Sequence, residues 1–194
     1  MRSLEVEIER ILPGGSGLAH AEGLTIFVPL TAPGDVVRID LNRVKGKLGF
    51  ATLKEVVKAS PARVEAPCPY FGRCGGCDFQ QLTYEAQLQA KLEIIRDCLH
   101  RIAQIKELPS ISMESSAHEW QYRSRASWQV DPSRQRLGYF QGGSHSICDV
   151  EYCAVLVPKL EQVLEKLREK MRVGELNNQS GEISAVAGDG IETV

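Results

Sequence analysis

Short segments with alternating apolar and polar side chains fill the first sixty residues. The alternation from Leu4 to Ile11 is the period-two pattern of a half-buried strand. Turns rich in glycine and proline, the first at Pro13–Gly17, separate it from further strand-like segments at Leu24–Val28, Val36–Leu41 and Gly49–Lys58. Strands of this length and spacing predict a small closed barrel of the OB type, although a generic small β-domain has the same pattern.

The alternating pattern ends at a segment with prolines near both ends, residues 60–67. Pro61 and Pro67 lack backbone N–H donors and disfavour helix in the residues before them. We therefore expect a barrel at residues 1–59, a linker at 60–67 and a second domain at 68–194. The last residues, 188–194, contain neither a capping device nor a tail, so we expect the second domain to be cut off at its carboxyl end.

The second domain combines helical and strand patterns. Apolar residues recur every three or four positions from about Tyr84 to Ile105, after a possible cap at Thr83, and again from Pro158 to near Gly174. Between these helices, alternation predicts a hairpin over residues 121–141 and a third strand. The mixture predicts an α+β fold, with the third strand at 145–150 and a last one at 182–187.

Charge changes this picture locally. The chain has 194 residues, 43% hydrophobic and 25% charged, with a formal net charge of −2, which excludes a uniformly basic nucleic-acid binder. Between Val36 and Lys58, however, six lysines and arginines face only two acidic residues. The predicted hairpin adds a second basic face, because its alternation projects Arg123 and Arg125 from one side and displays Tyr139.

Three cysteines lie within ten residues, at Cys68, Cys74 and Cys77. Thiolates with this spacing can enclose one ion or cluster, because Gly75 and Gly76 let the backbone bend tightly and bring N–H groups near the sulfurs. An iron–sulfur cluster is favoured, since structural zinc usually takes two closely spaced cysteine pairs. A zinc site and plain reduced or disulfide-bonded cysteines are the alternatives.

A fourth thiolate has to come from elsewhere in the chain. Cys153 is the best candidate, because Cys98 falls inside a helical pattern and Cys148 inside a strand-like one. The sequence also has no apolar signal region or spanning segment. We therefore expect a cytoplasmic protein with reduced thiols and no membrane association.

The order of these features resembles a known family. The barrel, the cysteine segment, Trp120–Arg125, Gly138–Phe140 and Ile147–Cys153 follow one another as in the amino-terminal part of the RNA 5-methyluridine methyltransferases, including those of 23S rRNA. The resemblance implies a TRAM domain, which is an OB-like RNA-binding barrel, followed by a central domain with a four-iron four-sulfur cluster. The ligands that it implies are Cys68, Cys74, Cys77 and Cys153.

The resemblance also implies a reaction. The family transfers a methyl group from S-adenosylmethionine to uridine C5, using a cysteine thiolate that adds to C6. These parts belong to a carboxyl-terminal Rossmann-like domain that would follow Val194, so we expect no catalytic domain in this chain and no activity from it alone. A cluster closed by four thiolates favours a structural role over redox chemistry.

RNA is the expected partner of a monomeric protein, with large-subunit ribosomal RNA favoured over transfer RNA by resemblance. Phosphate contacts are expected from the basic regions, and stacking on unpaired bases from Phe27 or Tyr139. The candidate RNA-binding residues are Arg38, Arg43, Lys45, Lys47, Arg123, Arg125 and Tyr139. A self-contained RNA-binding module with iron–sulfur or zinc and no catalysis is the alternative.

Overall fold

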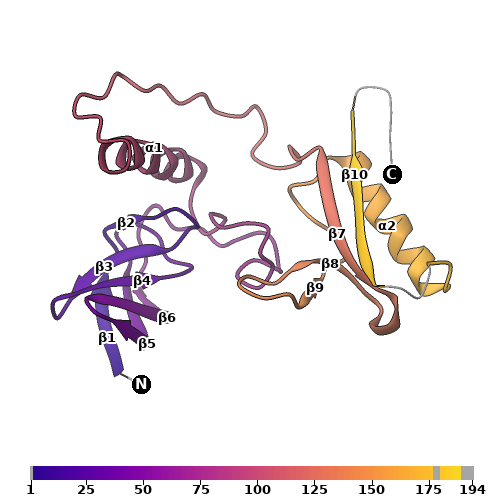
Figure 1. The fold of residues 1–194 in the computed structure, drawn as a ribbon, viewed down its shortest axis with the longest axis horizontal. Coiled ribbons are helices and arrows are strands. Elements are labelled where there is room, and N and C mark those ends of the chain that lie inside the picture. Colours follow the sequence, from indigo (N-terminus) through magenta and orange to yellow (C-terminus); the bar gives the residue numbers. More distant parts are fainter. Residues whose placement is uncertain (1, 177–179, 189–194) are drawn as a thin grey trace. The chain divides into compact units, whose positions relative to one another are not determined.

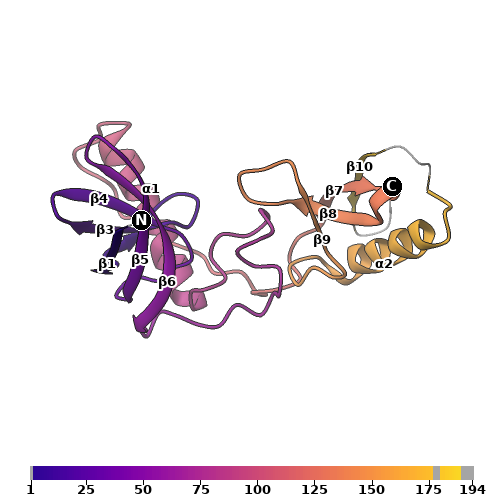
Figure 2. The same ribbon diagram turned by 90° about the horizontal axis from the view of Figure 1, so that it is seen from below.

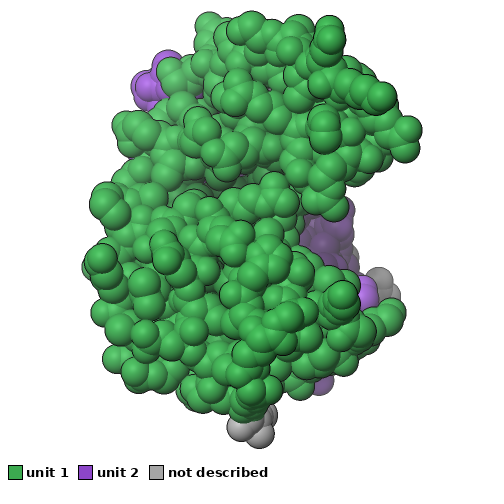
Figure 3. Space-filling view, turned by 90° about the vertical axis from the view of Figure 1, so that its left-hand side faces the viewer, with its two compact units in different colours: residues 1–66, 78–115 green, residues 67–77, 116–194 purple. Residues whose placement is uncertain are grey.

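The computed structural model describes residues 2–176 and 180–188. Contacts divide the chain into a first unit, Met1–Ala66 with Asp78–Ser115, and a second unit, Pro67–Cys77 with Ser116–Val194 (Figure 3). This division crosses the predicted linker at 60–67, because residues 78–115 group with the amino-terminal strands; the predicted domain limits stay a prediction. No helix in the described part of the chain is long and apolar enough to cross a membrane.

The first unit contains, among its described residues, a six-stranded sheet in the order β1-β5-β6-β4-β3-β2 (Figure 1). Its neighbours pair antiparallel, except that β4 and β6 run parallel. β1 and β2 lie at opposite ends of this order although only Ile8 and Glu9 separate them, while closure into a barrel stays a prediction. The strands are β1 (Arg2–Glu7), β2 (Arg10–Ile11), β3 (Gly17–Ala21), β4 (Leu24–Val28), β5 (Val36–Lys45) and β6 (Leu48–Lys58).

The alternating pattern predicted most of this sheet. The segments expected at 24–28, 36–41 and 49–58 are strands, and β5 continues to Lys45. The sequence did not reveal β3, because the strand begins at a residue counted with a turn. Gly17 is buried there, and a Cβ at this position would lie 2.1 Å from Thr31 Oγ1 and 2.8 Å from the Ile8 side chain. The glycine therefore belongs to a close approach inside the sheet.

Helix α1 (Tyr84–Arg101) begins as predicted, since the Ala86 N–H donates to Thr83 Oγ1 at 3.2 Å. It ends four residues earlier than expected, and Ile102 beyond it is 80% exposed. Its Ala90 belongs to a small apolar cluster with Ile11 and Ala32 of the amino-terminal part and Leu82, which lies just before the helix. The helix thus packs on residues of the first unit.

A buried carboxylate holds the segment after β6 in place. Asp35 is fully buried and accepts hydrogen bonds from the backbone N–H groups of Ala32 at 2.7 Å and Ser60 at 2.9 Å. Arg63 completes the arrangement with an ion pair of 2.7 Å. Because each donor needs this one acceptor, the carboxylate is a structural centre of the first unit.

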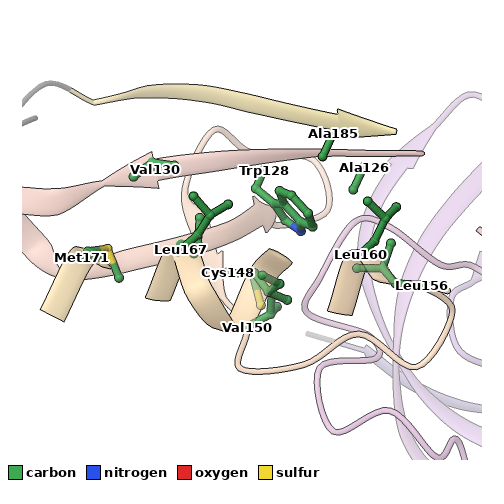
Figure 4. Packing of buried hydrophobic residues seen from close by; sticks show 12 residues of the cluster. Ala126, Trp128, Val130, Cys148, Val150, Leu156, Leu160, Leu167, Met171 and Ala185 are labelled. Atoms are coloured by element: carbon green, nitrogen blue, oxygen red, sulfur yellow. The ribbon is translucent and has the colours of Figure 1, made fainter. Parts of the chain in front are cut away.

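The second unit contains, within the residues described, a four-stranded antiparallel sheet in the order β10-β7-β8-β9, with helix α2 against it (Figure 1, Figure 2). Figure 4 shows Trp128, which is fully buried, flanked by Leu160 and Leu167 of the helix. The predicted α+β character of this part is thereby observed. The elements are β7 (Arg125–Asp131), a 3-10 turn (Pro132–Arg134), β8 (Arg136–Phe140), β9 (Ile147–Asp149), α2 (Pro158–Arg172) and β10 (Gly181–Val186).

Strand β7 is shorter at its amino-terminal end than the alternating pattern predicted. The strand expected from residue 121 begins only at Arg125, because Gln121 has a φ of 56° and Arg123 forms only an isolated bridge with Leu156. The apolar face predicted for this strand is confirmed, since Ala126 and Val130 are buried. The predicted cut-off at the carboxyl end concerns residues 188–194, of which 189–194 lie outside the described residues.

Candidate functional site

The cysteine segment folds as a series of tight turns against the end of β8. Within it, the Cys74 N–H donates to the Tyr70 carbonyl at 2.8 Å, and the Gly75 N–H donates to the Phe140 carbonyl at 2.9 Å. A Cβ on Gly75 would lie 3.0 Å from that same oxygen. Glycine therefore avoids a tight contact where the segment meets the sheet, and Cys74 packs against the core of the second unit.

The structure brings together three of the four predicted thiols. Burial raises the pKa of Cys74 to about 11, and the nearby sulfurs of Cys148, Cys77 and Cys153 add to the rise. Burial also raises the pKa of Cys153, to which the Cys77 sulfur contributes. Cys68 is partly buried at the start of the turns, and all six cysteines are free of disulfide bonds.

Backbone contacts hold Cys153 where the sheet gives way to α2. Its N–H donates to both carboxylate oxygens of Glu161, at 3.1 and 3.2 Å. Glu161 lies in the first turn of α2, where its charge also suits the helix dipole. Cys98, which the helical pattern excluded as a ligand, lies on α1 in the first unit.

Two buried polar atoms near these thiols have no hydrogen-bond partner among the described residues, the Tyr139 hydroxyl and the Trp128 indole nitrogen. Burial raises the pKa of Tyr139, and the neighbouring Cys153 sulfur adds to the effect. Both atoms are donors, and a thiolate or sulfide is an acceptor that would satisfy them. Trp128 could not be predicted in this role, because the alternation of its strand marks it only as a core residue.

The thiols and the polar groups beside them can be compared with the ligands of a metal centre. The donors are soft thiols, which suit iron–sulfur clusters and zinc, and unpaired donors lie beside them. Nevertheless, among residues 2–176 and 180–188 no group of three or more histidine, cysteine, aspartate or glutamate side chains is arranged to hold a metal ion. The thiol ligands and the unpaired donors beside them therefore suit a thiolate-bound metal group. Among the described residues, however, the thiols are not arranged as a coordination sphere.

Tyr139 does not lie as the hairpin pattern predicted. It shares a face of β8 with Leu137, which is fully buried, and its hydroxyl is buried as well. The Tyr139 side chain is therefore not displayed on the outside of the β7–β8 hairpin. This geometry does not favour the predicted contact of Tyr139 with RNA. Of the two arginines of this region, Arg125 is exposed at the start of β7 and Arg123 is partly buried.

Exposed cations and aromatic rings meet where β5 turns into β6. The guanidinium of Arg43 lies 5.7 Å from the Phe50 ring centroid, and the Phe27 and Phe50 centroids are 5.3 Å apart. Lys45 and Lys47 flank Gly46 at the turn and are exposed, and within the described residues neither ammonium group has an ion-pair partner. Phe27, Arg43, Lys45, Lys47 and Phe50 are called the hairpin surface below. Phe50 was not predicted; its signal is an aromatic side chain on a strand that starts among lysines.

The rest of the predicted basic cluster is largely neutralised. Arg38 forms ion pairs with Glu55 and, at 3.8 Å, with Glu5. Lys54 lies 3.3 Å from Asp40. A cation held by a neighbouring carboxylate offers less to a phosphate, so the hairpin surface is the stronger part of the predicted RNA-binding set.

The chain is similar to known proteins both in its amino-terminal strands and over nearly its whole length. Residues 4–62 match the family model of the TRAM domain of tRNA (uracil(54)-C(5))-methyltransferase. The chain is 36% identical over 194 residues to the 23S rRNA (uracil(1939)-C(5))-methyltransferase RlmD of Halomonas elongata, covering 98% of this chain and 40% of that protein. It is 35% identical over 174 residues to an uncharacterized RNA methyltransferase of Halalkalibacterium halodurans, covering 87% of this chain and 37% of that protein. The chain resembles the amino-terminal part of the RNA uracil-C5-methyltransferases.

A solved methyltransferase supports the same fold. The crystal structure of Pyrococcus abyssi tRNA (uracil-54, C5)-methyltransferase in complex with S-adenosyl-L-homocysteine matches with a TM-score of 0.65 and 24% identity, over 94% of this chain and 42% of that chain. The chain thus spans about two fifths of the length of its methyltransferase relatives. The predicted TRAM domain and the predicted resemblance are confirmed.

Proposed function

We propose that this chain is the RNA-recognition part of an S-adenosylmethionine-dependent RNA uracil-C5-methyltransferase acting on 23S rRNA. The observation that carries the proposal is its alignment over 98% of its length with 40% of a protein named for that reaction. In this proposal residues 1–59 form a closed TRAM barrel, 60–67 a linker and 68–194 the central domain. The protein acts in the cytoplasm as a monomer.

RNA binding is assigned first to the hairpin surface. Arg43, Lys45 and Lys47 supply charge to backbone phosphates, and the paired rings of Phe27 and Phe50 supply a face for an unstacked base. Additional phosphate contacts are assigned to Arg38, Arg123 and Arg125, of which Arg125 is exposed and Arg123 partly buried. Proteins commonly bind single-stranded RNA by stacking its bases on aromatic side chains, with cationic side chains at the phosphates.

A four-iron four-sulfur cluster is assigned to Cys68, Cys74, Cys77 and Cys153. Support comes from the shared neighbourhood of three of these thiols and from the unpaired donors at Tyr139 and Trp128. When bound, such a cluster with four thiolates ties separate chain segments together and leaves no iron open to substrate. This chain's contribution is to supply the ligands and to shield them by burial.

Methyl transfer is assigned to the part of the relatives that this chain does not cover, so the 194 residues alone are expected to be inactive. The test uses the complete protein containing this chain, 23S rRNA without the modification and isotope-labelled S-adenosylmethionine. Nucleoside mass spectrometry is expected to detect labelled 5-methyluridine. RNA binding without any such product would refute the enzyme proposal and leave an RNA-binding module.

A further inference from the structure

A groove of about 780 Å³ lies within the first unit, between the strands and the carboxyl-terminal turn of α1. Phe27 and Phe50 line its strand side, and Cys98, Arg101 and Ile102 line its helix side. Figure 3 shows this unit hollowed between its two parts. The groove shares its aromatic pair with the hairpin surface, but its second wall lies outside residues 4–62, which match the TRAM domain.

The lining of the groove combines apolar side chains with the charged side chains of Arg10, Asp97 and Arg101. The Phe27 and Phe50 rings lie 5.3 Å apart, and both are accessible from the groove. At the rim, Asp97 lies 3.3 Å from Arg10 and 3.2 Å from Arg101. One carboxylate thus orients two guanidinium groups and neutralises only one of them, which leaves a net positive charge.

We propose that this groove binds one unstacked base of single-stranded RNA. The base packs on Phe27 and Phe50, while its flanking phosphates meet Arg10 and Arg101 on one side and the hairpin lysines on the other. This inference rests on the proposed RNA-binding function and deepens it, because it makes α1 the second wall of the RNA site.

Three properties favour this occupant. Every base has an aromatic face that stacks on phenylalanine regardless of sequence. The volume of the groove lies within the range of sites that enclose small ligands. The single net positive charge of Arg10, Arg101 and Asp97 complements phosphate, whereas an apolar helix from a protein partner would leave that charge uncompensated. A duplex is disfavoured because its bases are stacked inside it.

The test uses the purified protein and a uridine hexanucleotide with one central 4-thiouridine. Irradiation is expected to cross-link the thiobase to Phe27, Phe50 or residues 97–102, located by peptide mass spectrometry. Phe50→Ala and Phe27→Ala are each expected to weaken binding about fivefold or more, since stacking on one ring is lost. Val57→Ala is the matched control, because Val57 is 45% exposed on the same strand and does not line the groove.

Circular dichroism of each variant separates lost stacking from lost folding, and the cross-link in the unaltered protein does not depend on any variant. Cross-links outside the groove, undiminished affinity in both phenylalanine variants, or no binding of the hexanucleotide would each overturn the groove assignment. The methylation assay reports on the proposed function independently. Methylation retained together with cross-links elsewhere would reject this inference and keep that function.

Discussion

Replacing Lys45 and Lys47 by glutamine removes the exposed cations at the turn between β5 and β6. Glutamine keeps much of the length and polarity of lysine, and Gly46 keeps the φ of 61° that the turn requires. Both side chains are exposed, and within the described residues their ammonium groups have no ion-pair partner. The double substitution is therefore expected to leave the fold intact and to remove charge available to phosphate.

The magnitude follows from counterion release. Each phosphate neutralised on a single strand contributes about 0.7 to the slope of log K against log salt concentration. Two contacts fewer should flatten the slope by about 1.4. Between about 50 and 200 mM salt, the affinity of the variant should consequently fall about sevenfold less than that of the unaltered protein.

Fluorescence anisotropy with a labelled single-stranded RNA, repeated over a salt series, measures this slope. Lys54→Gln is the control, because Lys54 lies 3.3 Å from Asp40 and offers no unpaired charge. An unchanged slope in the double variant, or an equal change in Lys54→Gln, would refute the reasoning and place the phosphate contacts elsewhere on the molecule.

Three further predictions concern the cysteine centre, the buried carboxylate of Asp35 and the partly exposed carboxylate of Asp149. Cys153→Ser should lose bound iron and acid-labile sulfide on anaerobic purification, whereas Cys148→Ser should keep both. Asp35→Ala should destabilise the first unit by about 3–5 kcal/mol, measured by urea unfolding with hydrogen exchange, because three donors lose one buried acceptor. Burial opposes ionisation of Asp149, but hydrogen bonds from Arg168 and the nearby charge hold its pKa below the usual value, so its stabilisation is present above about pH 4 and lost as pH falls through the lowered pKa.

Each of these has a specific control. Full iron in Cys153→Ser would remove that residue from the ligand set. Both tryptophans lie in the second unit, so Asp35→Ala should leave the tryptophan fluorescence transition unchanged, and a shifted transition would contradict a local role. Asp149→Asn should flatten the acid limb of the second unit's stability curve; an unaltered limb would assign the acid sensitivity to another group.

Sequence patterns predicted those strands and helices whose formation depends on residues close together in the chain. Period-two alternation and the Thr83 cap depend on neighbours in sequence, so β4, β6 and α1 were predictable to within a few residues. β3 was not, because Gly17 is required by contacts with Thr31 and Ile8, which are distant in the chain. The apolar stripe of α1 likewise does not identify the residues on which the helix packs, so its contact with Ile11 and Ala32 could not be predicted.

The candidate site also combines features that follow from neighbouring residues with features that depend on distant contacts. Spacing was enough to identify the cysteine segment and the basic region between Val36 and Lys58, because each is continuous in sequence. It could not reveal that Tyr139 turns its hydroxyl inward or that Arg38 is paired with Glu55, since both depend on contacts between strands. The groove beside Phe50 also joins segments about fifty residues apart, which no local pattern connects.

The interleaved course of the chain has a consequence during translation. Cys74 and Cys77 leave the ribosome before residues 78–115, which complete the other unit. They also precede Phe140, whose carbonyl accepts from Gly75, and Cys153, which packs on the same core as Cys74. At about 5–20 residues per second, roughly 75 further residues take on the order of 4–15 s to synthesise. For that interval the nascent polypeptide carries its cysteine segment without the strand and the last thiol that later enclose it.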